Sequence, residues 1–317
     1  MRPLAFILTA LLAAGAAVLA AAPQPLPKPE AAPYLQTPPA PPSPCLNPPY
    51  VFGVRPGSPT LFRIPASGLR PMAFSATGLP PGLTLDPQKG ILSGTIAETQ
   101  PRTYPIRVTA KNAHGEATET FRIVVGDRIA LTPPMGWNSW YVWSESIDQR
   151  HWEEAAELFE KSGLADYGWS YINLDDCWQG ERQGPDLALQ ANEKFPDIQA
   201  AVARIHALGL KAGLYSTPWI GSYAGFRGGS SARADGADDG LPAAERLQPG
   251  QLFGRYPGHV RFKANRTGEH WFFDADMRQI AAWGFDFIKV DWNPNDIPTT
   301  ERISTAVRSQ PRDIVLS

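Results

Sequence analysis

Ile288-Lys289-Val290-Asp291-Trp292 decides the fold class, together with Asn173-Leu174-Asp175-Asp176-Cys177-Trp178 upstream. Each stretch ends a short apolar run with carboxylates, at the point where a buried strand should emerge, and parallel α/β folds keep their chemistry at such strand ends. Alternation along the strand places Lys289 and Asp291 on one face. A lysine and a carboxylate share a buried face only when they are paired or functional, although a half-exposed surface strand is an alternative.

Strands and helices alternate from Asp127 onward, which predicts a parallel sheet. We expect strands over 135–140, 171–174, 210–215, 285–290 and 314–316, and helices over 149–161, 196–208, 274–283 and 301–308. No glycine-rich phosphate loop follows the first strand, so a (β/α)8 TIM barrel is favoured over an open Rossmann-like sheet. A complete barrel needs about 250 residues. The stretch 127–317 therefore predicts an incomplete TIM barrel, the N-terminal part of a catalytic domain that continues past Ser317.

The chain ahead of this region divides into three further parts. Residues 1–22 are typical of a signal peptide, with Arg2, an apolar run and small residues for cleavage, and an uncleaved membrane anchor is the alternative. Residues 23–49 form a Pro-rich linker. Residues 50–126 show short alternating runs broken by turn residues, which predicts a small antiparallel β-sandwich that serves as a spacer or accessory module.

Export predicts a secreted or periplasmic protein. The net charge is −2, so no general field favours nucleic acid or an anionic membrane. Export also permits disulfides, but with only two cysteines a Cys45–Cys177 bridge is allowed and not indicated.

The adjacent carboxylates of Asp175 and Asp176 suit two neighbouring sugar hydroxyls, each accepting a charge-assisted hydrogen bond. A metal pair is the rival interpretation, but the histidines expected for a transition-metal site are missing nearby. We therefore expect a carbohydrate ligand and no metal or cofactor.

The sandwich region carries a resemblance of its own. Its Leu79-Pro80-Pro81-Gly82-Leu83 and Gly90-Ile91-Leu92-Ser93-Gly94-Thr95 pieces, in that order, resemble the immunoglobulin-like (Ig-like) modules attached to many exported bacterial enzymes. This resemblance implies an Ig-like fold without a catalytic role.

The barrel region resembles the α-galactosidase (melibiase) group of glycoside hydrolase family 27. The resemblance rests on four ordered motifs: Pro134–Trp140, Leu174–Trp178, Gly209–Ser216 and Phe287–Asp291. It implies that Asp291 is the nucleophile of a retaining glycosidase. It also implies that Asp175 and Asp176 bind sugar hydroxyls, and that the sugar subsite is lined by Trp140, Tyr215 and Lys289.

The implied reaction is hydrolysis of terminal α-galactosides by double displacement, through a covalent glycosyl-aspartate intermediate. Lys289 would favour the ionised carboxylate that the nucleophile requires. The family's acid/base aspartate would fall beyond Ser317, so we assign that role to no residue here and expect the 317-residue polypeptide alone to be poorly soluble and inactive. Relatives often have a cysteine soon after the nucleophile, whereas Trp292 follows Asp291 here.

Three alternatives stay open at this point. The family includes activities on α-N-acetylgalactosaminides, β-L-arabinopyranosides and isomaltose-type glucans. A non-catalytic carbohydrate-binding protein is the alternative from another class. The stretch 216–273 is either a rim loop that contacts the rest of a glycan or a disordered insertion.

Overall fold

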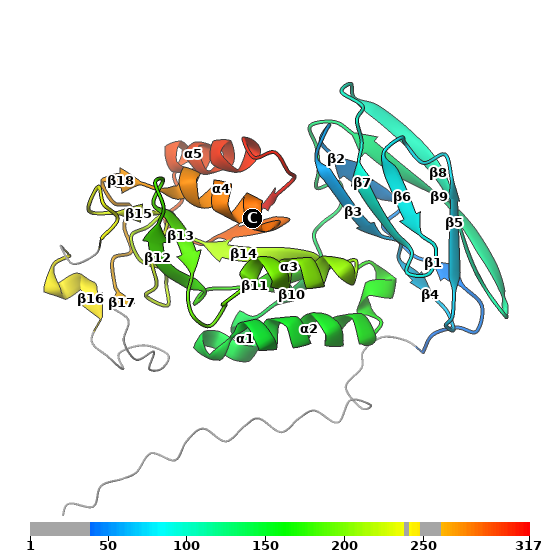
Figure 1. Ribbon diagram of the computed structural model, residues 1–317, viewed down its shortest axis with the longest axis horizontal. Helices are drawn as coiled ribbons and strands as arrows, with labels where there is room; N and C mark the ends of the chain where they lie inside the picture. The colour runs from blue at the N-terminus through cyan, green and yellow to red at the C-terminus, as the bar shows by residue number, and fades with distance from the viewer. Residues whose placement is uncertain (1–38, 238–240, 248–260) are drawn as a thin grey trace, which may run out of the picture. The chain divides into compact units, whose positions relative to one another are not determined.

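The computed structural model describes residues 39–237, 241–247 and 261–317. The predicted signal peptide and most of the predicted linker lie outside these ranges. Figure 1 shows the described strands and helices with their labels.

The first part is a β-sandwich of two sheets, one in the order β2-β9-β8-β5 and the other in the order β3-β7-β6, with a separate β1-β4 pair. The strands are β1 (Cys45–Leu46), β2 (Val51–Val54), β3 (Pro59–Arg63), β4 (Ala66–Ser67), β5 (Ala73–Thr77), β6 (Leu83–Asp86), β7 (Ile91–Thr95), β8 (Arg102–Asn112) and β9 (Gly115–Val125). The pairs are antiparallel, as predicted, with one exception: β2 pairs with β9 in parallel, which the prediction of a purely antiparallel sandwich missed. Strand pairing begins at Cys45, inside the stretch expected to be linker.

Alternation along β8 and β9 builds the sandwich core. Ile106, Val108, Phe121 and Ile123 are at most 1% exposed, while the residues between them face outward. The turn joining the two strands is closed by Asn112, whose side-chain oxygen accepts the His114 backbone N–H at 2.8 Å. The period-2 prediction for this hairpin is confirmed.

The second part is built on a five-stranded sheet in the order β10-β11-β14-β19-β20. Its strands are all parallel and follow one another in chain order: β10 (Gly136–Asn138), β11 (Tyr171–Leu174), β14 (Lys211–Ser216), β19 (Phe287–Val290) and β20 (Val315–Leu316). The helices that alternate with them are α1 (Trp140–Trp143), α2 (Gln149–Lys161), α3 (Ile198–Ala207), α4 (Phe273–Trp283) and α5 (Ile297–Arg308). The predicted parallel α/β arrangement is confirmed, and the described strands form an open sheet.

Short elements lie on the connections. They are the 3-10 turns η1 (Ser144–Ser146), η2 (Leu164–Tyr167) and η3 (Ala243–Glu245), and the paired strands β12 (Gln179–Gln183) with β13 (Ala188–Ala191), β15 (Ser230–Ser231) with β18 (His270–Trp271), and β16 (Arg246–Leu247) with β17 (Arg261–Phe262). The described part of 216–273 is therefore ordered strand and turn, which removes the disordered alternative for those residues.

The helix α5 begins four residues before its expected start. Asp296 caps it by accepting the Thr299 backbone N–H at 2.8 Å, and a proline stands in the first turn. Asp at the N-cap and Pro in the first turn are ordinary helix start signals, and they set the start of α5 ahead of the expected Glu301.

A buried carboxylate joins the start of β19 to its neighbours. Asp286 accepts hydrogen bonds from His206 at 2.7 Å, from Arg312 at 2.6 Å and from the Ala212 backbone N–H at 2.9 Å. These contacts tie β14, β19 and β20 together at the N-terminal edge of the sheet.

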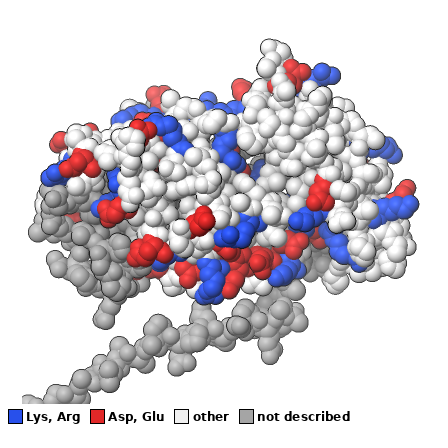
Figure 2. Space-filling view, in the orientation of Figure 1, with Lys and Arg blue, Asp and Glu red and all other residues white. Residues whose placement is uncertain are grey.

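Among the described residues, no helix has the length and apolar character needed to cross a membrane. On the face drawn in Figure 2, acidic and basic side chains are intermixed and neither sign forms a continuous field.

Gly213 lies in β14, the central strand, and its substitution tests how closely the neighbouring strands pack against it. A methyl group at this buried position would collide with the Asn173 side chain and with Phe287, which pair with it from the two neighbouring strands. We expect Gly213→Ala to destabilise the protein by roughly 1–3 kcal/mol, since overpacking forces neighbours apart. Denaturant unfolding measures this loss. The matched control is Gly126→Ala, where a methyl group meets no atom within 4 Å; equal losses in both variants would contradict the expectation.

Candidate active site

The strand register brings the predicted site residues to one edge of the sheet. Leu174 in β11 is level with Leu214 in β14, which is level with Ile288 in β19. Asp175 and Asp291 therefore leave the sheet at its C-terminal edge, on either side of β14. The Asp291 backbone N–H still donates to the Ser216 carbonyl at 2.9 Å.

Lys289 connects the two carboxylates. Its Nζ lies 2.9 Å from Asp175 Oδ2 and 3.8 Å from Asp291 Oδ2. It also lies 5.2 Å from the centre of the Tyr215 ring. The expectation that Lys289 and Asp291 share a face and pair is confirmed, and four of the six predicted site residues lie in direct contact around this ammonium.

Asp175 is held rigidly from β10 as well. Asn138 Nδ2 donates to its Oδ2 at 2.6 Å, and its backbone N–H donates to Ser139 Oγ at 2.9 Å. Asn138 and Ser139 are not among the predicted site residues. Their position at the end of the first predicted strand, on the same edge as the carboxylates, was the signal that could have found them.

Asp176 faces the protein in this structure. Its Oδ1 accepts from Gln179 and from the Cys177 backbone, and its Oδ2 accepts from the Ala224 backbone N–H at 3.0 Å. The chain breaks after it, where Cys177 adopts a left-handed φ of 86°. Burial raises the pKa of the Asp176 carboxyl, although the hydrogen bond from Ala224 opposes this. Sugar binding by Asp176 stays a prediction, and it requires the segment around Ala224 to give way to a hydroxyl.

Tyr215 offers a hydroxyl to this space. The residue is 1% exposed, and among the described residues only the Tyr223 backbone lies near enough to its hydroxyl to lower the pKa of the phenol, without the geometry of a full hydrogen bond. Burial raises the pKa of this phenol, and the charges of Asp176 and Asp291 raise it further, so the hydroxyl keeps its proton. Trp178, also buried, donates its indole N–H to the Tyr215 carbonyl at 2.9 Å and so fixes this strand end.

Three aromatic residues lie on the segments next to the carboxylates. Trp140 and Trp292 are partly buried and pack against the α/β core, and the Trp140 backbone N–H donates to Asn138 at 2.9 Å. Tyr223 is 41% exposed and packs edge-on against Trp219 with ring centres 5.2 Å apart. Burial and the nearby charge of Asp291 raise the pKa of Tyr223. The stretch 216–273 gave no sequence signal for this tyrosine.

Burial outweighs Lys289 in setting the protonation of Asp291. The side chain is 37% exposed. Burial raises its pKa above the ordinary aspartate value, Lys289 lowers it, and the charge of Asp175 raises it again, with a net increase. Lys289 thus lowers the pKa of Asp291 as predicted, but burial and the charge of Asp175 raise it by more.

Two further expectations from the sequence concern a metal site and a disulfide. Within the described ranges, no group of three or more His, Cys, Asp or Glu side chains could hold a metal ion. Cys45 and Cys177 form no disulfide; the first is exposed and the second buried. A cavity of about 460 Å³ lies away from the carboxylates, between β3 and α3.

Both parts of the chain match known families. Residues 43–126 match the family described as "Putative Ig domain", and residues 132–239 match the family described as "Alpha galactosidase A". The resemblances inferred from the motifs are confirmed, and the family to which the second part is related is one of glycoside hydrolases.

Individual relatives agree with these family matches. An α-galactosidase of Coffea arabica is 31% identical over 209 residues, which cover 64% of this chain and 45% of the relative. Alpha-galactosidase A of Cellvibrio japonicus is 31% identical over 52% of this chain and 31% of its own length. The chain thus spans less than half of these curated relatives.

A solved structure matches both parts at once. A "putative alpha-galactosidase" of Bacteroides fragilis superposes with a TM-score of 0.71 at 31% identity, covering 87% of this chain and 52% of its own. Neither part of this chain alone could supply that coverage.

The raised pKa of Asp291 predicts a pH-dependent effect on stability. A carboxyl whose pKa is higher in the folded protein stabilises the fold fully below its unfolded pKa, and this contribution is lost as the pH rises through the folded pKa. We therefore expect Asp291→Asn to have a higher thermal midpoint than the unmodified protein at pH 7, and the difference to vanish in acid. Melting curves across pH measure this, with the exposed Asp274→Asn as control; an Asp291→Asn protein less stable at neutral pH would contradict the expectation.

Proposed function

We propose that this chain is the N-terminal part of an exported retaining glycoside hydrolase that acts on terminal α-galactosides. The observation that carries the proposal is the half-buried Asp291 carboxylate beside Lys289 and Asp175 at the C-terminal edge of a parallel sheet, in a chain related to the α-galactosidases. Catalytic groups of α/β barrels lie at this edge.

Asp291 would attack the anomeric carbon while the glycosidic bond to the leaving oxygen breaks, giving a covalent glycosyl-aspartate. Water would then release the sugar with retained configuration. The second carboxyl group of such an enzyme lies about 5–5.5 Å from the nucleophile and protonates the leaving oxygen. Asp175 does not suit that role, because its side chain is 3% exposed and bonded to Lys289 and Asn138. We assign the acid to no residue of the printed chain.

The remaining predicted residues would hold the sugar. Trp140 would supply a flat wall for its C–H face and Tyr215 a hydroxyl that makes no hydrogen bond of full geometry with the described residues. Asp175, Lys289 and, after a local shift, Asp176 would bind its hydroxyls.

The same proposal includes the domain plan and the cellular location. Residues 1–22 would be a signal peptide and 23–49 a linker, followed by the Ig-like module over 50–126. Residues 127–317 would be part of a TIM barrel, because five parallel strands in chain order are how such a barrel begins. The protein would be secreted or periplasmic, with a carbohydrate partner and no cofactor.

Activity of the protein expressed from its whole reading frame tests the nucleophile. We expect hydrolysis of p-nitrophenyl α-galactoside, and a loss of about 10³-fold or more in kcat for Asp291→Ala. Azide enters the space left by the carboxylate, so it should restore turnover to Asp291→Ala and yield a glycosyl azide of inverted configuration.

Asp274→Ala, on the exposed face of α4, is the matched control and should retain full activity. The protein could instead hydrolyse an α-N-acetylgalactosaminide, a β-L-arabinopyranoside or an isomaltose-type glucan. That result would change the proposed sugar but leave the proposed class, a retaining glycoside hydrolase, unchanged. Binding of galactosides without hydrolysis of any of these would establish the carbohydrate-binding alternative.

Lys289 should set the acid limit of the reaction. The nucleophile must be ionised, and Lys289 lowers the pKa of Asp291. We expect Lys289→Met to move the acidic limb of kcat/KM to higher pH, in addition to lowering its maximum. A pH–rate profile of both proteins shows the shift; an unmoved limb would mean that Lys289 does not act on the nucleophile.

A further inference from the structure

We propose that the Ig-like module is a fixed cap on the N-terminal edge of the parallel sheet, and that it unfolds together with the α/β part as one cooperative unit. The sequence predicts a spacer, which would need few contacts with its neighbour. The observed contacts are numerous, charged and confined to one edge of the sheet.

Several of the α/β residues that meet the module lie on the segments that lead into strands. Asp166 precedes β11, Leu208 precedes β14, and Asp313 precedes β20. The module therefore lies on the edge where strands begin. Asp175 and Asp291 lie where strands end, so the module leaves the candidate site open.

Arg55, which follows β2, is the most heavily bonded of the module's side chains. Its Nε donates to Asp313 Oδ1 at 2.6 Å and its backbone N–H to Asp313 Oδ2 at 2.9 Å. Its guanidinium nitrogens donate to the carbonyls of Arg308 at 2.6 Å and Gln310 at 2.9 Å. These carbonyls lie at the C-terminal end of α5, where backbone oxygens lack helical donors and a cation is favoured.

The helix α3 is capped in the same way. Arg63 of β3 donates to the Leu208 carbonyl at 2.8 Å and to Glu160 at 3.0 Å, with its own side chain only 10% exposed. Lys89 donates to the Ala207 carbonyl at 3.1 Å. Two helix C-termini of the α/β part thus receive their capping cations from the module, and this is a role that a tethered spacer would not have.

Close packing accompanies these bonds. A methyl group on Gly209, which has a φ of +76°, would lie 2.9 Å from Ile91 of the module. The Lys211 ammonium at the start of β14 lies 4.5 Å from the centre of the Phe52 ring. Backbone and side chains of the two parts approach too closely here for independent movement.

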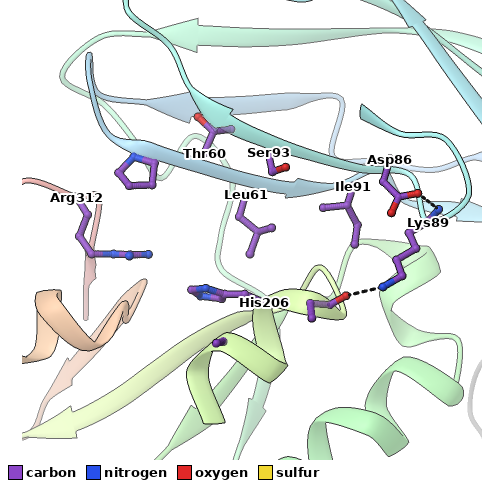
Figure 3. A pocket seen from close by; sticks show the side chains of 11 residues that line it. Thr60, Leu61, Asp86, Lys89, Ile91, Ser93, His206 and Arg312 are labelled. Carbon is purple, nitrogen blue, oxygen red and sulfur yellow. Dashed lines mark hydrogen bonds between the residues drawn. The ribbon is translucent and has the colours of Figure 1, made fainter. Parts of the chain in front are cut away.

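A cavity interrupts the interface. Figure 3 shows Arg312 and His206 facing Thr60 and Leu61 across it, with Lys89 at the far side. Thr60 Oγ1 and Arg312 Nε are buried and have no partner in the described part of the chain. The surfaces of the module and of the α/β part therefore do not touch at the cavity. The charged contacts on either side of it hold the two parts together. The Bacteroides relative, which superposes over both parts, supports one fixed arrangement.

The distribution of tryptophan allows a direct test. All 10 tryptophans lie between Trp137 and Trp292, so the module contributes no tryptophan fluorescence. Val108→Ala and Phe121→Ala weaken only the module's core. We expect each to lower the fluorescence-monitored thermal midpoint of the α/β part by about 3 °C or more. Hydrogen exchange of β8 and β9 verifies that the module itself was weakened.

Interface variants complete the experiment, in the protein expressed from its whole reading frame. Arg55→Ala should lower the same midpoint by about 5 °C or more, whereas Arg107→Ala, an exposed arginine of β8, should change it by about 1 °C or less. Faster exchange in β8 and β9 with an unchanged fluorescence midpoint would overturn the proposal. An unchanged midpoint in Arg55→Ala would also overturn it. These readouts do not involve sugar, so the cap and the proposed enzymatic function fail separately.

Discussion

The level ends of three parallel strands are the constraint on which the candidate site depends. β14 lies between β11 and β19, and the register aligns Leu174, Leu214 and Ile288 across the sheet. Because the strands stop together, an ammonium from one can reach carboxylates that are more than a hundred residues apart in the chain. A shift of register by one residue would turn Lys289 and Asp291 to the opposite face of the sheet.

At this edge of the sheet, burial raises the pKa of the carboxyl groups, whereas hydrogen-bond donors and the nearby ammonium lower it. The carboxyl groups of Asp176 and Asp291 both have a raised pKa, with burial as the largest cause in each. Hydrogen bonds from Ala224 and Gln179 reduce the cost for Asp176, whereas Asp291 has Lys289 at 3.8 Å and remains partly open to solvent. Several fixed donors of the surrounding loops thus hold the Asp176 carboxylate in place, whereas the Asp291 carboxylate has the single ammonium of Lys289 nearby.

The sequence predicted the architecture better than the details of the site. Alternating apolar periods and strand-end carboxylates suffice to predict the parallel sheet and the Lys289–Asp291 pair, since both follow from local geometry. The inward turn of Asp176 depends on Ala224, which is 48 residues away, and the place of Tyr223 depends on the same loop. The contact between the two parts depends on the hydrogen bonds of Arg55 to the C-terminal end of α5, and no local sequence pattern predicts these bonds. Long-range contacts of this kind leave no periodic trace in a single sequence.

A carboxylate flanks each end of strand β19, and the pKa values of the two are shifted in opposite directions. Burial would raise the pKa of Asp286, but the hydrogen bond and charge of His206 and the charge of Arg312 lower it below its usual value, whereas the pKa of Asp291 is raised. As the medium becomes acidic, the Asp291 carboxylate is protonated before that of Asp286, which still holds β14 and β20. Mild acidification should therefore remove the charge at the C-terminal end of the strand reversibly, while the contacts at its N-terminal end keep the sheet together.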